Sequence, residues 1–445
     1  MKRALLGSLL VLTMVAAACT SDSGDGGGGD GSGDGSSGGG VTNITLWQGF
    51  GAKDVDNNGV PNYEAQSIRE LIDEFNASHP DIHVEDVFAG SNDKVLQKLT
   101  VALQGGEAPD ISYQYGSSLP QLAQAPGIID LTDVVQESAW DWEDFIEGAR
   151  TAATFEGRVL GVPALIDNLA IIYNKDLFDE AGVDYPTSEW TWDDFRSAAA
   201  ALTDPAKKQF GFAFPASADE DTVWHYDAML WESGGEILNP DNTAAAFNSP
   251  AGLQALTTLR DMSVTDGSVY NDLQNAKIDD LFNSGKIGMV ISGPWALPGY
   301  PDVNYGTEIM PSYDGSNHET IAGPDMWVAF DNGEAERAAT LEFLQWFTAK
   351  EQVLADSMLT GHLPTRTSVL SDPGFAEFGT KFPGVDLFAE NLANVKKARP
   401  VLASYPQISE AMGAMVVSVM LGDQEPQAAL DEAEQQVNDV LELPA

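Results

Sequence analysis

Residues 51 to 66, GAKDVDNNGVPNYEAQ, carry oxygen-bearing side chains at the spacing of a calcium-binding loop. The order D-x-[DN]-x-[DN]-G wraps hard oxygen ligands around one ion and turns the chain at the glycine. Position twelve, where a bidentate glutamate is expected, is Ala65, and Glu64 stands one residue earlier. The six oxygen donors of the segment are Asp54, Asp56, Asn58, the Val60 carbonyl, Asn62 and Glu64. A structural Ca²⁺ ion, a contact to a bound solute and a plain polar turn remain three open interpretations, and no other cofactor is expected.

The charge balance excludes one class of partner. The 445 residues include 22 Lys and Arg against 68 Asp and Glu, which gives a net charge of −46. Nucleic acid binding needs a basic surface for the phosphates, so we expect no nucleic acid partner. Anionic membranes and strongly anionic substrates are disfavoured for the same reason. The length suits two or three domains with cores of their own.

The N-terminus is typical of an export signal. Lys2 and Arg3 precede the apolar run ALLGSLLVLTMV, and AAAC follows it. The run is too short for a convincing membrane span. The tetrad that ends in Cys19 resembles a bacterial lipobox, although Ala16 stands where leucine is usual. We therefore predict a signal peptide over residues 1–18 and lipidation of Cys19, so that the exported lipoprotein is held at the outer face of the cell membrane by its lipid alone.

Cysteine and histidine chemistry is largely excluded. Cys19 is the one cysteine of the chain, so an intrachain disulfide and a cysteine-based zinc site are both ruled out. The histidines lack the H-E-x-x-H spacing of zinc hydrolases. They are His79, His83, His225, His318 and His362.

A disordered tether and a folded body follow the signal. Residues 21–40 consist only of Ser, Asp and Gly, and such a tract buries no apolar area, so we predict a tether over residues 19–40.

From residue 41 the pattern alternates between strand and helix. Residues 41–50 predict a strand with Ile44 and Leu46 on one face. Residues 65–80 predict a helix whose apolar stripe includes Ile68, Leu71, Ile72 and Phe75, and residues 82–88 predict a second strand.

Later helices are marked by their caps. Thr191 with Asp194 forms a capping pattern, and Ser249 precedes Pro250 at the start of another helix. The last helix is expected to begin at Pro426.

Motifs in one order run along the whole chain. They are ITLWQGF, IRELIDEFNASHPDIHVE, LTVALQGGEAPDISY, GRVLGVPALIDNLAIIYNKDLFDEAG, TWDDF, LWESGGEIL, FNSGKIGMVISGPWAL, GHLPTR and ALDEAEQQVNDVL. Together they resemble the family 1 extracellular solute-binding proteins, the group that contains maltose-binding protein. The resemblance implies an α/β, two-lobed periplasmic-binding-protein-like fold of type II, with lobes that are discontinuous in sequence and joined by a hinge. Lobe 1 is then predicted over 41–164 and 292–347, and lobe 2 over 165–291 and 348–445. The chain crossings are expected near Val162–Ile166, Ile291–Gly293 and Thr348.

The resemblance also implies a function. A protein of this group captures a small-molecule carbohydrate, a sugar or an oligosaccharide, between the lobes and delivers it to the transmembrane subunits of an ABC permease. It acts as a monomer and performs no catalysis. Ligand that bridges both lobes stabilises the closed state.

Several aromatic and polar residues are candidates for the site. Sugars present apolar C–H faces and a rim of hydroxyls, so they need flat rings and short polar side chains. Trp295 and Asp167 match family positions that stack on sugar and bind its hydroxyls. The other candidates are placed at strand ends, at turns between the lobes, or beside the helix before Gly234 and Gly235: Trp47, Tyr113, Gln114, Tyr115, Asn168, Trp224, His225, Trp231, Met326 and Trp327. The register of residues 113–115 is open by one position, and one of Trp224, His225 and Trp231 is expected to face ligand.

Other conspicuous residues are interpreted as structural. Five tryptophans have helical spacing and acidic neighbours, which is typical of packing: Trp140, Trp142, Trp190, Trp192 and Trp346. Arg366 is expected to close a loop through a carboxylate.

Two rival functions remain open. A secreted glycosidase needs two carboxylates roughly 5–10 Å apart, and no spacing singles out such a pair among the acids. The same fold also suits a polyamine, a peptide or glycerol phosphate. A cation would use acids together with aromatic rings, whereas a phosphate would need clustered Arg or Lys, which are scarce near the candidate loops.

Overall fold

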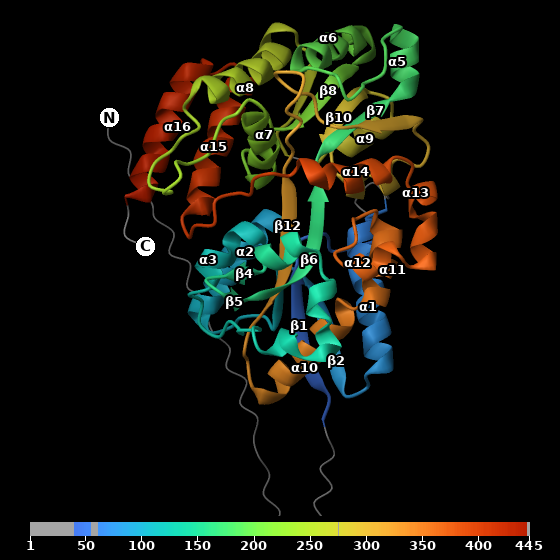
Figure 1. Ribbon diagram of the computed structural model, residues 1–445, viewed down its shortest axis with the longest axis vertical. Helices are drawn as coiled ribbons and strands as arrows, with labels where there is room; N and C mark the ends of the chain where they lie inside the picture. Colours follow the sequence, from blue (N-terminus) through green and yellow to red (C-terminus); the bar gives the residue numbers. More distant parts are fainter. Residues whose placement is uncertain (1–39, 55–60, 275, 443–445) are drawn as a thin grey trace, which may run out of the picture. The chain divides into compact units, whose positions relative to one another are not determined.

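The computed structural model describes residues 40–54, 61–274 and 276–442. The body that begins at Val41 is built on two five-stranded sheets, each with its own helices (Figure 1). Each lobe also has an apolar core. The expectation of a two-lobed α/β fold is confirmed. The predicted signal peptide and most of the tether, residues 1–39, lie outside the described residues.

The first lobe contains the sheet with strand order β2-β1-β3-β12-β6. Strand β1 runs parallel to β2 and β3, while β12 is antiparallel to β3 and β6. The strands are β1 (Thr42–Gln48), β2 (Ile82–Phe88), β3 (Ile111–Tyr115), β6 (Gly161–Asn168) and β12 (Ala322–Ala329). A short hairpin pairs β4 (Thr154–Phe155) with β5 (Arg158–Val159). The helices are α1 (Tyr63–Ser78), α2 (Asn92–Gly105), α3 (Leu119–Leu122), α4 (Glu147–Ala152), α10 (Glu334–Phe347), α11 (Lys350–Thr360) and α12 (Thr367–Leu370).

The second lobe contains the sheet with strand order β11-β7-β10-β8-β9. Its strands are β7 (Ala170–Asn174), β8 (Phe210–Pro215), β9 (Val269–Asp272), β10 (Ile287–Ser292) and β11 (Tyr305–Glu308). Its first helices are α5 (Lys175–Ala181), α6 (Trp192–Leu202), α7 (Glu220–Glu232), α8 (Pro250–Arg260) and α9 (Ile278–Asn283). The later ones are α13 (Phe378–Lys381), α14 (Val385–Asn391), α15 (Tyr405–Met420) and α16 (Pro426–Leu441).

The sequence patterns predict the local structure where they are strongly periodic. In β1, Ile44 and Leu46 are fully buried while Thr45 and Trp47 are half-buried, as strand alternation requires. The predicted apolar stripe of α1 is buried. The Thr191 capping box is present at α6, Ser249 caps α8, and α16 begins at Pro426. These predictions are confirmed.

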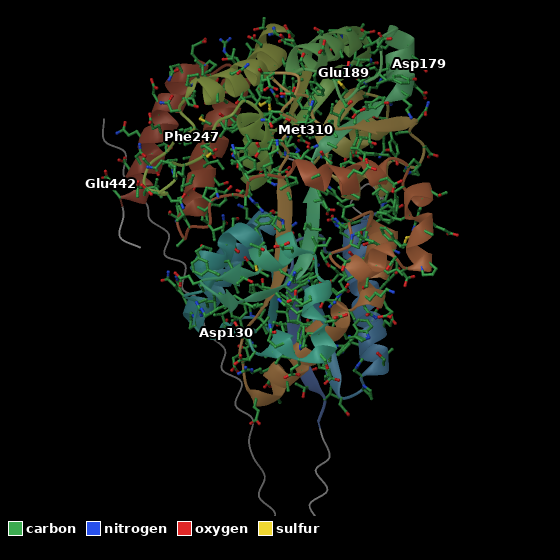
Figure 2. The ribbon with its side chains drawn as sticks, in the orientation of Figure 1. Asp130, Asp179, Glu189, Phe247, Met310 and Glu442 are labelled. Carbon is green, nitrogen blue, oxygen red and sulfur yellow. The ribbon has the colours of Figure 1, made fainter. Side chains whose placement is uncertain are left out.

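Apolar side chains fill both lobes, and charged ones cover their outer surfaces. Met310 and Phe247 are almost fully buried in the second lobe, whereas Asp130, Asp179 and Glu189 are exposed (Figure 2). The five tryptophans expected to pack do so: three are buried, and Trp190 and Trp346 pack against the cores. Arg366 is structural as predicted, since its buried guanidinium lies 3.4 Å from Asp144.

The chain passes between the sheets at places that differ from the predicted crossings. Strand β6 remains in the first sheet as far as Asn168, and β7 begins in the second sheet at Ala170. Strand β11 lies in the range assigned to lobe 1 (292–347) but pairs antiparallel with β7, so that assignment is wrong for 305–308. The chain returns to the first sheet only at β12.

The expected crossing at Thr348 is also wrong. Helix α11 follows it and packs on α1 of the first lobe, where Ser67 donates a 2.6 Å hydrogen bond to Asp356. The transfer to the second lobe comes after α12, because α14 packs on β11. Both corrections have one cause: partners more than 100 residues away in the chain decide on which lobe a segment packs.

Candidate functional site

A cavity of about 400 Å³ lies between the two lobes. Side chains of β3, β6, β12 and α1 line it from the first lobe, and those of α7 and the turn after β10 line it from the second. Five lining side chains are aromatic: Phe50, Tyr113, Tyr115, Trp224 and Trp295. Seven are charged or titratable: Glu64, Asp167, Glu220, Asp221, Asp325, His362 and Arg399. The rest are Gly49, Ser91, Asn92, Leu165 and Gly323.

Two tryptophans of the second lobe lie next to each other in this cleft. Trp224 comes from α7 and Trp295 from the 3₁₀ turn that follows β10, and their ring centroids are 5.8 Å apart at an interplanar angle of 34°. Gly293 makes room for the second ring, because a Cβ atom there would lie 1.7 Å from Trp295 Cζ3. Tyr113 and Tyr115 are presented by β3 of the first lobe. The cleft therefore combines aromatic surface from both lobes.

A histidine joins two carboxylates at the base of the cleft. His362 Nδ1 contacts Asp167 Oδ2, and its Nε2 lies 3.1 Å from Glu64 Oε1. The backbone N–H of Leu363 donates to Asp167 Oδ1 at 2.9 Å. Burial by itself lowers the pKa of His362, but the Asp167 and Glu64 carboxylates outweigh it and raise that pKa well above its usual value. The imidazolium neutralises much of the charge of these two acids.

A buried arginine joins the lobes on the other side. Arg399 Nη1 lies 2.8 Å from Glu220 Oε1 of α7, and its Nη2 lies 3.7 Å from Asp325 Oδ1 of β12. The Tyr113 hydroxyl donates to Asp325 Oδ2 at 2.6 Å. Burial raises the pKa of Asp325, while Arg399 and the tyrosine hydrogen bond lower it, and the net direction is upward. The guanidinium is thus already held by protein carboxylates.

Some buried polar atoms in the cleft have no protein partner. Trp224 is 8% exposed, and its Nε1 donates no hydrogen bond to any described residue. Asn92 Oδ1 likewise accepts none within the described chain. A buried donor or acceptor without a partner costs about 1–3 kcal/mol. Both atoms are therefore suited to bind polar groups of a ligand.

The structure brings five of the twelve candidate ligand-binding residues together. Tyr113, Tyr115, Asp167, Trp224 and Trp295 all line the cleft.

The other seven do not line it. Gln114 is buried and donates to Ser112, Asn168 donates to the Phe388 carbonyl, and Trp231 is packed in the second core. His225 bridges the carbonyls of Asp221 and Ile291. Met326 and Trp327 are buried in the cores of the first lobe, and Trp47 is half-buried on β1.

Strand geometry explains why three of these residues, Gln114, Met326 and Trp327, lie away from the cleft. On β3, Tyr113 and Tyr115 share one face and Gln114 takes the other. On β12 the register shifts between Asp325 and Met326, and Asp325 is the side chain that lines the cleft.

Five of the residues missed from the sequence are charged or titratable. Glu220, Asp221, Asp325, His362 and Arg399 line the cleft but were not candidates. His362 stands in the GHLPTR motif, which signalled the family without singling out the imidazole.

The calcium-like segment is only partly described. Asp56, Asn58 and Val60 lie outside the described residues. Asp54 pairs with Arg69, the Asn62 side chain caps α1 by accepting from the Ala65 N–H at 3.0 Å, and Glu64 pairs with His362. In the described part of the chain no three His, Cys, Asp or Glu residues are grouped to hold a metal ion. Calcium binding stays a prediction, for which the melting temperature with and without a chelator is the test.

Nor does any helix within the described ranges have the length and apolarity needed to cross a membrane. Cys19 lies outside those ranges.

Comparison with known proteins gives consistent matches. The family described as bacterial extracellular solute-binding protein matches residues 61–354. The structure of the ABC substrate-binding protein Lmo0181 from Listeria monocytogenes, in complex with cycloalternan, is similar with a TM-score of 0.79 and 25% identity, over 91% of this chain and 100% of that one. The cyclic alpha-maltosyl-1,6-maltose binding protein of Arthrobacter globiformis gives a TM-score of 0.70 and 28% identity, over 90% and 99%. The sn-glycerol-3-phosphate-binding periplasmic protein of Pectobacterium atrosepticum is 24% identical, over 84% of this chain and 88% of its own.

Proposed function

Since the chain belongs to the bacterial extracellular solute-binding proteins, we propose that it captures a sugar or an oligosaccharide between its two lobes and delivers this solute to an ABC importer. The observation that carries the proposal is the pair of tryptophan rings, Trp224 and Trp295, in a cleft that also contains unpartnered polar atoms. Family and neighbours bind solutes rather than transform them.

The chemistry of the cleft fits a neutral polyol. A sugar ring stacks its C–H face on an indole and turns its hydroxyls to the polar edge. A hydroxyl both donates and accepts hydrogen bonds, so the hydroxyls of a sugar suit both kinds of atom: the Trp224 N–H, which donates, and the Asn92 side-chain carbonyl, which accepts. A similar structure at 25% identity is a complex with cycloalternan, and another at 28% identity is named a cyclic alpha-maltosyl-1,6-maltose binding protein; both support a carbohydrate.

Glycerol phosphate is the second candidate, because several relatives are named for it. The charges in the cleft oppose it. Arg399 is the guanidinium that lines the cavity, and Glu220 and Asp325 already lie beside it. Five carboxylates line the same space, and they repel a phosphate.

A glycosidase is disfavoured by the use of the carboxylates. Asp167 and Glu64 are both held by His362, and Glu220 is held by Arg399. A catalytic pair needs one acid that is protonated and one that is free to attack or to activate water.

Binding in this cleft couples to lobe closure. The lining residues come from both lobes, so a solute that touches both stabilises the closed state over the open one. The closed monomer is the form that the permease subunits would recognise. Lipidation at Cys19 would hold the exported protein at the outer face of the cell membrane, and the Cys19→Ser variant tests this: it should be released into the medium.

Isothermal titration calorimetry tests the solute class. The panel contains glucose, galactose and xylose with their di- and trisaccharides, sn-glycerol 3-phosphate and spermidine. We expect binding of at least one sugar and no heat from the other two compounds. Binding of glycerol phosphate or spermidine without any sugar would refute the carbohydrate proposal.

A further inference from the structure

A second cavity, of about 620 Å³, adjoins the cleft. Four residues line both spaces: Ser91, Asn92, Tyr115 and Glu220. Each cavity by itself falls within the range of roughly 300–1,000 Å³ that is typical of small-molecule pockets. Together they offer more room than a single sugar ring needs.

This second cavity is also formed by both lobes. From the first lobe, α2 and the turn before α3 contribute residues between Ser91 and Gln121. From the second lobe, the loop Ser217–Glu220 at the start of α7 and the first turns of α15 contribute the rest. A ligand in this space would therefore also contact both lobes.

The lining changes character between the two cavities. The tryptophan pair belongs to the cleft alone, whereas hydroxyl and amide side chains dominate the second cavity. They include Gln97, Thr100, Ser117, Gln121, Ser217 and Gln407. The charged side chains there are one lysine, Lys94, and the three acids Asp219, Glu220 and Glu410. Neutral groups that both donate and accept suit the hydroxyls of a polyol chain.

Two polar atoms of the second cavity lack protein partners. Ser217 Oγ and Asn92 Oδ1 are buried and make no hydrogen bond to any described residue. The neighbouring Ala218 has a φ of +61°, a left-handed conformation that costs a non-glycine residue free energy. Gly413 of α15 packs against it, since a Cβ atom at Gly413 would lie 2.8 Å from the Ala218 carbonyl oxygen. The packing holds Ser217 at the cavity in spite of the strain.

We propose that the solute is an oligosaccharide of at least two rings, with one ring at the Trp224–Trp295 pair and the next in the second cavity. This inference rests on the proposed function. Ser217 binds a hydroxyl of the second part of the ligand, and Asn92, which lines both cavities, lies where the two parts meet. Because that part touches both lobes, it strengthens closure as well as adding contacts.

The experiment is calorimetry of the full mature chain with mono-, di- and trisaccharides of the three sugar series. Gln97→Trp places a bulky ring at the wall of the second cavity, at an exposed position of α2 where folding is undisturbed. Val101→Trp is the matched control, one turn further along the same helix, 69% exposed and outside both linings. For at least one series, the wild-type affinity should rise at least tenfold from monosaccharide to trisaccharide. Gln97→Trp should remove this rise and keep the monosaccharide affinity, while Val101→Trp should keep both.

Three outcomes would count against the inference. Equal affinity for mono- and trisaccharide, or a rise that survives in Gln97→Trp, would overturn the second subsite and leave the carbohydrate function standing. If no sugar of any series binds the wild-type chain, the proposed function fails and this inference fails with it.

Discussion

Removal of the Trp295 ring should weaken solute binding strongly while the chain remains folded. The ring is half-buried, stands beside Trp224 and lies 6.2 Å from the His362 ring by centroids. It is therefore fixed on two sides and retains a surface in the cleft. Trp295→Ala deletes this platform without removing a buried charge or a helix cap.

The expected loss follows from the area that the ligand covers. A tryptophan buries about 150–250 Å² in all, and about 60 Å² of that is a reasonable share for one sugar ring. At ~25 cal/mol per Å², this area contributes about 1.5 kcal/mol. Ring stacking adds ~0.5–1.5 kcal/mol. The sum of about 2–3 kcal/mol corresponds to a loss of roughly 30- to 150-fold in affinity.

Calorimetry with the tightest sugar of the panel measures this loss. Circular dichroism and the melting temperature establish that the variant is folded. Trp346→Ala is the matched control, because Trp346 is also half-buried but packs on Phe75 in the first lobe, away from the cleft. An affinity of Trp295→Ala within twofold of wild type, or an equal loss in Trp346→Ala, would refute the stacking role.

Three further predictions concern polar groups. Trp224→Phe keeps a ring but removes the unpartnered Nε1–H, so affinity should fall about tenfold (~1.4 kcal/mol) in calorimetry. Burial alone would lower the pKa of His362, but the Asp167 and Glu64 carboxylates raise it overall in the folded state. The folded chain therefore keeps a proton on His362 that the unfolded chain releases above pH ~6.5. This proton's contribution to the free energy of unfolding is complete below pH ~6.5 and is lost as the pH rises through the folded-state pKa. Urea titrations should therefore show a steeper fall of the free energy of unfolding with pH in wild type than in His362→Gln. Arg366→Met leaves several buried hydrogen-bond partners unsatisfied and should destabilise the fold by about 3–5 kcal/mol, with unchanged affinity in the molecules that remain folded.

Two of these variants have a control of the same residue type. Trp346→Phe should leave affinity unchanged. Arg337→Met removes an exposed ion pair to Asp331 and should cost less than about 1 kcal/mol. The first prediction would be contradicted if Trp224→Phe bound sugar with full affinity. The second would be contradicted if the free energy of unfolding of wild type and of His362→Gln fell equally with pH, and the third if Arg366→Met were as stable as wild type.

The sequence predicts those features that are encoded within a few residues. The stripe Ile68, Leu71, Ile72 and Phe75 specifies the buried face of α1, because helical periodicity alone places these side chains together. The lobe assignment of β11 is not encoded in this way. It depends on pairing with β7, 131 residues earlier at Tyr305 and Asn174, and nothing within the strand itself indicates that partner.

The same distinction explains the site. Trp295 was found from its motif, and Tyr113 and Tyr115 from a strand end, since each signal is local. His362 was missed because its role depends on Glu64 and Asp167, which lie 298 and 195 residues away in the chain. Met326 and Trp327 do not line the cleft, because β12 lies between β3 and β6 with both side-chain faces covered, and its register shift leaves Asp325 as the residue at the cleft.

The high negative charge of the chain is not by itself an argument for a cation as the ligand of the cleft. Composition alone left a polyamine open, since acids and aromatic rings together attract positive charge. In the structure, however, Asp167 and Glu64 each contact one ring nitrogen of His362, and Glu220 is paired with Arg399. A cation would have to compete with these partners, and each buried ion pair that loses one partner costs several kcal/mol. A neutral polyol leaves these ion pairs intact and binds the polar atoms that have no protein partner, Trp224 Nε1 and Asn92 Oδ1. The geometry of the cleft therefore favours a sugar, although the chain carries a net charge of −46.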